Sequence, residues 1–489
     1  MYVFTMPAER FDEENPNKQD ILHLITKHQA FVPRLQKLKD YYEGHHGILE
    51  DKERDNKLVC NHAKDIADTA SAYFLGNPIS YKSDDKDLSV ITDALETAGA
   101  DEADGDNALD LSIYGLAYDY IYAHRDATDL VIKNLEPENS FVVYDDTIEQ
   151  NELFGVYYYI RKDDTARTST PHYIATILTK NYKWVLDIEK IDQPQALIEG
   201  PVEHHLGEIP MIEWKNNKLG IGDYELQIPL IDAYNALMSD RITDKEQFID
   251  AILAVYGTLL TDEDDEEEGD GKGAEKAMKR LAKRKLLEMP DSTKAEYLTR
   301  TFDESGVEIL RHAIEQDIHK FSHIPCLTDE HFSGNTSGVA MEFKLLGIEN
   351  ITKIKTRYYR KGLRKRLRIF SNWLALNRQA QIDSNTITAN FTRALPKNLL
   401  EISQYVNNLK GTVSRKTLLS QIPFVDDPDA EIKAVKEETE EAIRQQQELF
   451  KEPGSGNEPP EADDEDPENS KPREGFKAVE KDEVEDGSE

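Results

Sequence analysis

The chain has 489 residues, and because a single hydrophobic core stops growing at roughly 250–300 residues, we expect two or more domains. Hydrophobic residues make up 38% of the chain and charged residues 31%, with a mean hydropathy of -0.65. This apolar content is lean for the length, so parts of the chain are predicted to be solvated or to bury surface against partners. The formal net charge of -36 predicts repulsion of nucleic acid in bulk, which argues against a repressor or a polymerase.

The cysteines and the apolar patterning restrict the class of protein further. Cys60 and Cys326 have no CxxC partner, which argues against a disulfide framework and fits a reducing cytosol. Residues 1–10 show no basic flank followed by an apolar run, so no signal peptide is expected. No window approaches the roughly 18 apolar residues of a membrane span, so no membrane association is expected.

The first half of the chain is predicted to be helical and then rich in strands. Helical spacing of apolar residues predicts two helices between 20 and 42, separated near Pro33, and further helices at 58–75, 88–97 and 107–114. Short β-rich runs between polar turns then predict an antiparallel sheet or meander at 118–122, 141–144, 155–160, 173–178 and 184–186. We expect these helices and strands to form one α+β domain.

A second helical region follows Gly222. One helix is predicted from Pro229, a favourable first-turn residue, through Val255, and another from Asp303 to Phe321. Between them we expect, in order, a strand at 256–260, a charged run at 262–270, a basic helix at 272–288 and a strand at 295–299.

The longest predicted helix runs from Gly338 to about Arg378 without a proline. At 1.5 Å per residue it would be about 60 Å long, whereas helices average about 11–12 residues, so it suggests a helix that runs through a large assembly. A strand is expected at 387–391, and helices at 399–409, 415–421 and 429–450. The remainder, 452–489, has fifteen acidic and four basic residues, which predicts disorder.

Five stretches, in order along the chain, resemble the portal proteins of SPP1-like tailed bacteriophages. They are residues 61–78, which end in Phe-Leu-Gly-Asn-Pro, and residues 136–147, 230–240, 317–322 and 334–347. The resemblance is collinear from about Asp20 to Phe450, and the acidic run from Asp262 and the tail past Lys451 lie outside it. No single stretch is decisive, but five in this order are specific.

The resemblance implies an α+β, mainly helical portal fold. Its parts would be a wing of helices plus an antiparallel sheet, a helical stem, a small α/β clip, a long tunnel-spanning helix and a helical crown. Here they would be the wing at 1–222, the stem helices at 223–255 and 303–326, the clip at 256–302, the tunnel loop at 327–337, the long helix with its return to the wing at 338–398, the crown at 399–450 and a disordered acidic tail at 451–489.

The resemblance also implies a function. Such a chain would be a structural subunit, not an enzyme, of a homo-oligomeric ring of twelve at one capsid vertex. Double-stranded DNA would pass through the ring during packaging by a separate terminase ATPase and during ejection, bound only weakly because carboxylates repel phosphates.

The same resemblance implies the partners and the location. They would be the terminase large subunit, a head-completion or adaptor protein, and the major capsid and scaffolding proteins. The ring would assemble in the host cytoplasm and reside in the virion, with no cofactor or metal ion implied.

Three groups of candidate site residues follow from these patterns. The tunnel loop, which would face the DNA, comprises Thr328, Asp329, Glu330, His331, Phe332, Ser333, Gly334, Asn335, Thr336 and Ser337. The clip residues expected to dock the terminase or an adaptor are Asp262, Glu263, Asp264, Asp265, Lys276, Lys279, Arg280, Lys283 and Arg284. The third group is a basic stretch without an acidic residue: Lys353, Lys355, Arg357, Arg360, Lys361, Arg364, Lys365, Arg366 and Arg368.

The basic stretch allows two interpretations. Its cations can contact DNA, or they can pair with acidic neighbours in a ring and form a solvated face. Because carboxylate partners are abundant in a chain of this charge, pairing is the preferred interpretation.

Other patterns give little support for a chemical site. The acids at 262–270 are consecutive, and Gly269 is the eighth residue of that run, which does not fit an EF-hand calcium loop. The pairs His45-His46 and His204-His205 are adjacent, and adjacent side chains point apart in a helix or a strand, which does not suit a shared metal ion.

No HExxH, GxSxG, GxGxxG or phosphate-binding Gly-Lys-Ser/Thr motif occurs. The alternatives to a portal are a DNA-processing enzyme or DNA clamp that uses 353–368, and a helical scaffold that forms monomers or open assemblies.

Overall fold

The computed structural model describes residues 3–83, 87–124, 128–161, 172–188, 197–249, 252–256, 294–298, 304–327, 338–393, 399–420, 422, 425 and 428–449. The chain divides into two compact units, Met1–Ser403 and Gln404–Glu489.

The strands of the first unit form two main sheets, where the sequence predicted one antiparallel sheet or meander. The larger has the order β1-β5-β6-β7-β8-β9 and is antiparallel except for the parallel pair β1–β5. The smaller is antiparallel, with the order β10-β3-β4. The strands are β1 (Phe4–Met6), β3 (Leu116–Ala123), β4 (Leu130–Leu135), β5 (Ser140–Asp145), β6 (Glu152–Arg161), β7 (His172–Leu178), β8 (Tyr182–Asp187), β9 (Leu197–Glu203) and β10 (Met211–Lys215).

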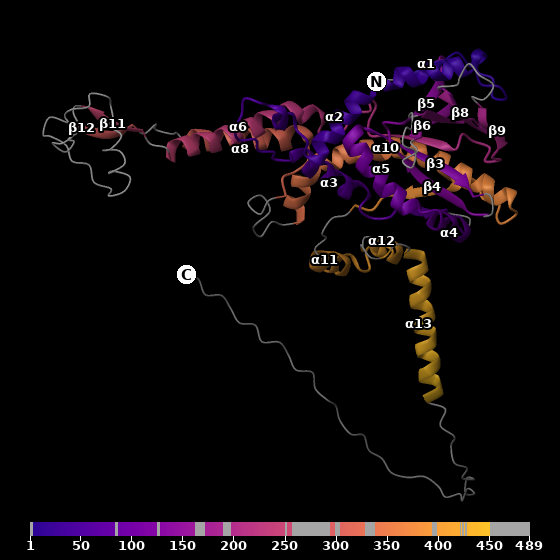
Figure 1. Ribbon diagram of the computed structural model, residues 1–489. Coiled ribbons are helices and arrows are strands. Elements are labelled where there is room, and N and C mark those ends of the chain that lie inside the picture. Colours follow the sequence, from indigo (N-terminus) through magenta and orange to yellow (C-terminus); the bar gives the residue numbers. More distant parts are fainter. Residues whose placement is uncertain are drawn as a thin grey trace, which may run out of the picture. The chain divides into compact units, whose positions relative to one another are not determined.

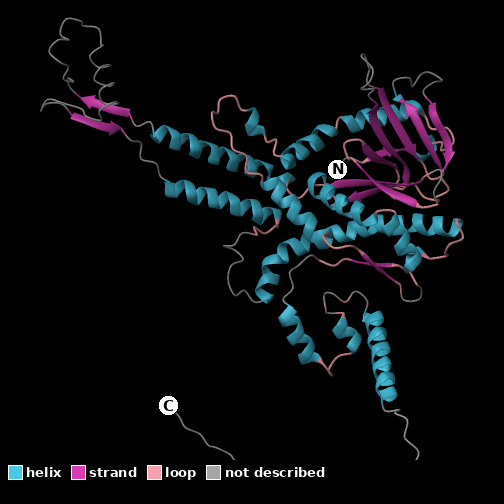
Figure 2. Cartoon of the chain, turned by 60° about the horizontal axis from the view of Figure 1, so that its bottom comes forward, coloured by secondary structure: helices cyan, strands magenta, loops and turns pink. Residues whose placement is uncertain are grey.

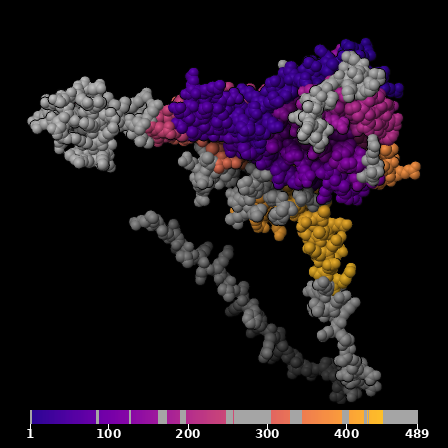
Figure 3. All heavy atoms as spheres, in the orientation of Figure 1, coloured from indigo at the N-terminus to yellow at the C-terminus, as the bar shows by residue number. Residues whose placement is uncertain are grey.

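Two N-terminal helices, α1 (Lys18–Gln29) and α2 (Val32–Glu43), confirm the predicted break, and Pro33 lies in the first turn of α2. Helix α1 places its apolar stripe against one face of the six-stranded sheet, in a cluster that includes Phe141 and Phe154. In the space-filling view the N-terminal residues, in indigo and purple, cover much of the visible face of the first unit (Figure 3).

The three-stranded sheet packs against helices on one face. These are α3 (His62–Leu75), α4 (Ser89–Thr97), α5 (Ala100–Tyr114) and the long α10 (Gly338–Leu376), whose 39 residues agree with the prediction (Figures 1 and 2). Along β3 the odd-numbered residues Ala117 and Ile121 belong to this helical side of the core, whereas Tyr118 belongs to the cluster on the other side.

Two helices, α6 (Ile228–Ile249) and α8 (Glu304–Ser322), run side by side as an arm that leads away from the sheets (Figure 1). The prediction that the first of them continues through Val255 was wrong, because β11 (Ile252–Tyr256) pairs antiparallel with β12 (Lys294–Leu298). A short apolar run of this kind fits a helix or a strand equally well, and only the distant partner strand decides. The predicted basic helix at 272–288 lies outside the described residues.

Beyond α10, the strand β13 (Thr388–Asn390) pairs antiparallel with β2 (Ser80–Lys82). The described residues then form the helices α11 (Leu399–Leu409), α12 (Arg415–Leu419) and α13 (Pro428–Leu449). Within the second unit, α12 and α13 are joined by an ion pair of 2.6 Å between Lys416 and Asp429. Short 3-10 helices are η1 (Ala8–Arg10), η2 (Gly47–Glu50), η5 (Glu225–Gln227) and η7 (Ser384–Thr386).

His28 lies in the centre of the contact between α1 and the six-stranded sheet. Its ring stacks on Phe141 at 4.9 Å between ring centroids, and its Nδ1 lies 2.8 Å from the hydroxyl of Tyr158. Burial lowers the pKa of His28 from 6.5 to about 4. The folded chain therefore holds this ring neutral at a pH where the unfolded chain protonates it.

This difference predicts acid sensitivity. The stabilisation linked to His28 is complete above pH 6.5 and is lost as the pH falls toward about 4, and it is on the order of 3 kcal/mol. In differential scanning fluorimetry between pH 7 and 4.5, His28→Gln should show a flatter decline of the melting midpoint than the wild type. His45→Gln, at an exposed histidine, is the control, and equal slopes for all three proteins would contradict the prediction.

Candidate functional site

Two of the three groups of candidate residues lie outside the described part of the chain. These are the tunnel loop, 328–337, and the nine clip residues between 262 and 284. The flanking elements are described: α8 ends at Ser322, and α10 begins at Gly338. The third group, the nine cations between 353 and 368, lies entirely on α10 and can be examined residue by residue.

Helix α10 distributes these nine cations over two faces. It buries Lys355, Lys365 and Arg366 in the body of the first unit. Arg368 is half-buried beside Glu208, with 2.7 Å between the charged groups. The exposed members are Lys353, Arg357, Arg360, Lys361 and Arg364.

Arg366 is the most deeply buried of the nine, with no exposed side-chain surface. Its two terminal nitrogens each lie 2.6 Å from a carboxylate, one from Asp104 on α5 and the other from Asp119 on β3. Asp104 also accepts a hydrogen bond from the hydroxyl of Tyr359, and Asp119 accepts one from Asn107 at 2.8 Å. The guanidinium thus ties three elements together: α10, α5 and β3.

Arg366, Asp104 and Asp119 form ion pairs that are buried away from solvent. Burial raises the pKa of Asp104 and of Asp119, and the nearby Arg366 guanidinium offsets part of that rise in both. Removal of the guanidinium would leave two carboxylates without a counter-ion in the core, which is more costly than the intact pair is stabilising.

Aromatic packing holds the guanidinium in place. Its central carbon lies 4.7 Å from the centroid of the Trp214 ring, and Trp214 stacks on Tyr359 at 4.1 Å between ring centroids. The helix approaches the indole so closely that a Cβ on Gly362 would lie 2.4 Å from a ring carbon. Any larger residue at 362 would push α10 away from Trp214.

The other two buried cations attach α10 at separate points. The ammonium of Lys365 pairs with Glu152 of β6 and donates to the carbonyl of Met211 at 2.7 Å. The ammonium of Lys355 pairs with Asp223, in the turn that leads to α6. That turn is pressed against the end of α5, because a Cβ on Gly222 would lie 2.2 Å from a backbone oxygen there. The base of the arm is therefore fixed to the long helix.

Three of the cations have partners within the chain. Lys355, Lys365 and Arg366 are buried and paired with carboxylates of their own chain, which favours pairing over contact with DNA. The exposed cations have fewer partners: Lys353 lies 3.6 Å from Glu349, and Arg360 lies over the ring of Phe391 at 5.6 Å. Within the described residues, Arg357, Lys361 and Arg364 have no ion pair and face solvent.

The arm is held by a different, solvated set of charges. Arg241 on α6 bridges Glu304 and Glu308 on α8, at 3.2 and 2.8 Å. Arg311 continues the row, with 2.7 Å to Glu308 and 2.7 Å to Glu315. Hydrogen bonds from Arg311 and Arg241 lower the pKa of Glu308 to about 2. Because these groups are only partly buried, salt weakens the pairing.

The described residues contain no group of three or more His, Cys, Asp or Glu side chains arranged to hold a metal ion. In the same part of the chain, no helix has the length and apolar character needed to cross a membrane. The charged residues of α10 and of the arm form ion pairs that position helices.

Sequence reasoning found the basic stretch but not its division into faces. A helical wheel would have shown it, because Arg366 shares the face of Tyr359, Leu363 and Phe370, all of which are buried. A cation in the middle of an apolar stripe predicts a buried carboxylate partner. The identity of that partner, on α5 and β3, could not be read from the local sequence.

Comparison with known proteins gives the following matches. Residues 21–445 match the family model described as Phage portal protein, SPP1 Gp6-like. The chain is 23% identical over 471 residues to the portal protein of Bacillus phage SPP1, covering 92% of this chain and 89% of that protein. It is 24% identical over 474 residues to the portal protein of Clostridium phage phiCD119, covering 86% of this chain and 96% of that protein. A solved structure described as the neck of a native GTA particle computed with C12 symmetry aligns with a TM-score of 0.44 and 10% identity, over 74% of this chain and 90% of that one.

The Arg366 cluster predicts an asymmetric effect of substitution. Arg366→Met should lower the free energy of unfolding by about 3–5 kcal/mol, because Asp104 and Asp119 are left unpaired. The triple variant Arg366→Met, Asp104→Asn, Asp119→Asn should recover part of that loss. Urea denaturation followed by tryptophan fluorescence measures both.

Arg364→Met is the matched control, since it removes an exposed arginine from the same helix and should change stability by less than about 0.5 kcal/mol. Equal losses for Arg366→Met and Arg364→Met would show that the buried pairs do not organise the fold.

Proposed function

Because the chain belongs to the SPP1 Gp6-like family of phage portal proteins, we propose that it forms the ring at one capsid vertex through which double-stranded DNA enters and leaves the virion. The role is structural, and the ATP chemistry of packaging belongs to a separate terminase. The observation that carries the proposal is the family match, which includes nearly every described element from α1 to α13.

The surface of the isolated chain supports assembly into a ring. Large apolar side chains stand exposed on α8 and at the start of α10: Ile309 is 71% exposed, and Phe343 is 72% exposed. Leu310, Phe321 and Leu346 are also among the exposed apolar residues of these two helices. Exposed apolar side chains gathered on neighbouring turns of a helix are often covered by a partner, and a head-to-tail contact repeated around an axis closes into a ring. Twelve copies are proposed, by family resemblance.

The alternative of a DNA clamp built on 353–368 is less well supported. Three of its nine cations, Lys355, Lys365 and Arg366, are buried and paired within the chain. The net charge of -36 also opposes tight binding of a polyanion. An acidic channel suits sliding, because a basic one would release counter-ions and hold the DNA.

The finer assignments are part of the same proposal. Residues 327–337 would form the loop that faces the DNA, and 256–302 would form the clip that docks the terminase large subunit during packaging and a head-completion or adaptor protein afterwards. The major capsid and scaffolding proteins would surround the ring, which would assemble in the host cytoplasm and remain in the virion.

Ring formation is the first test. Native mass spectrometry of the full chain at micromolar concentration should show a closed oligomer near twelve subunits, with a central hole in negative-stain images. Ile309→Glu combined with Leu310→Glu should shift the protein to smaller species, because two charges would enter the contact. His312→Glu, on the same exposed helix, is the control. A stable wild-type monomer at this concentration would contradict the proposal.

DNA binding is the second test. In a filter assay near 0.15 M salt, the wild-type ring should retain duplex DNA weakly. Asp329→Lys combined with Glu330→Lys should bind more tightly and with a steeper salt dependence, because each new phosphate contact adds about 0.9 to the slope of log K against log salt. Asp146→Lys combined with Glu149→Lys makes the same charge change at exposed positions elsewhere. If the two double variants bind alike, residues 329 and 330 do not face the DNA.

A further inference from the structure

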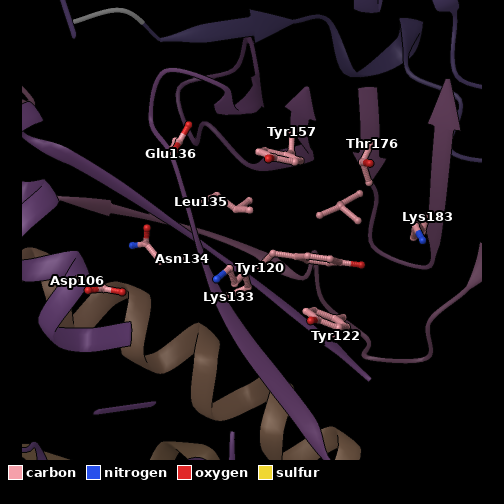
Figure 4. A pocket seen from close by; sticks show the side chains of 11 residues that line it. Asp106, Tyr120, Tyr122, Lys133, Asn134, Leu135, Glu136, Tyr157, Thr176 and Lys183 are labelled. Carbon is pink, nitrogen blue, oxygen red and sulfur yellow. The ribbon is translucent and has the colours of Figure 1, made fainter. Parts of the chain in front are cut away.

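A cavity of about 580 Å³ lies between the two main sheets and opens to solvent. Figure 4 shows Tyr120, Tyr122 and Tyr157 pointing into it, with Asp106 and Glu136 toward one end and Lys183 at the other. It is lined by α5, β3, β4, β6, β7 and β8, and we call it the tyrosine cleft.

The cleft exists because the two sheets meet on one side and diverge on the other. They touch where Met211 of β10 faces Gly155 of β6, since a Cβ on Gly155 would lie 2.6 Å from the Met211 sulfur. Met211, Tyr120 and Lys133 form one row across the smaller sheet. The facing row is Gly155, Leu178 and Lys183. The rows touch at Met211 and Gly155, and the cavity is lined by their other members, Tyr120 and Lys133 on one side and Leu178 and Lys183 on the other.

The tyrosines give the cleft an aromatic wall. Tyr118, Tyr120 and Tyr122 lie on one face of β3. Where the sheets are close, the hydroxyl of Tyr118 donates a hydrogen bond of 3.2 Å to Glu213. Farther along the strand, Tyr120 and Tyr122 stack on each other at 5.0 Å between ring centroids and face the open cleft. Burial raises the pKa of Tyr120 to about 12, so this phenol is neutral at physiological pH.

The charges around the cleft favour a cation. Lys183 is already paired with Glu199 at 3.1 Å, which leaves Lys133 as the cation without an ion pair among the described lining residues. Asp106 and Glu136 are both exposed, and within the described residues neither has a basic partner. The pKa of the adjacent Asp110 is raised to about 7, first by burial and then by Asp106, Asp119 and Glu136, which is consistent with a negative potential at this end.

The geometry points to a guanidinium as the group that fits. A planar cation stacks on a phenol face and donates two parallel hydrogen bonds to a carboxylate, and this cleft offers an aromatic wall with carboxylates at one end. A phosphate or nucleotide would meet two carboxylates and one unpaired lysine. The cleft is also open along one side, where a small molecule would remain exposed but an extended chain can lie.

We propose that the tyrosine cleft receives an arginine-bearing peptide segment of a protein partner. An arginine would stack on the wall of Tyr120 and Tyr122, the acidic end formed by Glu136 and Asp106 would attract a further basic side chain of the segment, and the flanking backbone would follow the open side. Because the cleft lies within one protomer, this binding does not rest on ring formation, and a failure of one proposal leaves the other standing.

The test uses the full chain and a fluorescein-labelled octapeptide of alternating glycine and arginine, with fluorescence anisotropy near 0.15 M salt. An acidic chain attracts any basic peptide, so the comparison is between variants of equal charge. Asp106→Asn combined with Glu136→Gln should weaken binding at least tenfold. Asp101→Asn combined with Glu102→Gln, exposed on the same helix as Asp106, should weaken it by less than twofold.

The aromatic wall is tested separately. Tyr122→Ala should weaken binding at least fivefold, whereas Tyr122→Phe, which keeps the ring, should bind as the wild type does. The lysine version of the peptide should bind more weakly than the arginine version. Melting midpoints within a few degrees of the wild type confirm that the variants are folded.

Three outcomes would overturn the proposal. One is an equal loss in the two charge-matched double variants, which would mean general attraction to an acidic surface. Another is tighter binding of the corresponding glutamate peptide or of inorganic phosphate. The last is indifference of binding to Tyr122→Ala in a folded protein.

Discussion

The first unit depends on three cations that α10 carries into the protein interior. A buried charge is tolerated only beside a counter-charge, and the carboxylates that meet Lys355, Lys365 and Arg366 come from α5, β3, β6 and the turn before α6. The positions of these elements are therefore coupled, because displacement of any one of them would strand a charge in the core. Apolar packing alone tolerates sliding, whereas these pairs specify one arrangement.

The arm also contains ion pairs between arginine and acidic side chains, but these pairs do not specify a single arrangement. Arg241 of α6 joins this helix to α8 through pairs with Glu304 and Glu308, whereas Arg311 pairs with Glu308 and Glu315 within α8. These partly exposed pairs contribute little and adjust easily. The ion pairs of α10 differ from those of the arm in how deeply they are buried and not in residue type. On the α10 side of the Lys355–Asp223 contact, buried ion pairs hold the elements in one arrangement. Along the arm, α6 and α8 are joined by charges whose pairing water and salt can replace.

Much of the helical part of the fold could be predicted from periodicity, because a helix is a local structure. The long helix was predicted to 378 and ends at Leu376, and the break near Pro33 was found. The sheets were harder, because strand pairing depends on residues distant in the chain. β1 is only three residues long and pairs with β5, and β10 pairs with β3, so neither carried a local signal strong enough to assign.

The same limit applied to the site. The basic stretch was evident in the sequence, but of its partners Asp104 lies just before the helix predicted at 107–114 and Asp119 lies in a predicted strand, and neither carries a local sign of an arginine partner. The tyrosine cleft had no sequence signature, since it arises from the angle between two sheets. Alternating tyrosines on β3 are typical of any half-buried strand, and only the divergence of the facing rows turns them into a surface.

The distance along the chain between the partners of the Arg366 cluster has a consequence for how the protein is made. Asp119 precedes Arg366 by 247 residues, and Asp104 precedes it by 262. At roughly 5–20 residues per second, the ribosome needs about 12–50 s to travel from the carboxylate to its counter-ion. During that interval both aspartates must stay hydrated, so α5 and β3 cannot close over them. Likewise, β2 cannot pair until β13 has been synthesised. The contacts that pair these buried carboxylates can form only once α10 has been synthesised, so the first unit cannot complete its core in the order of its synthesis.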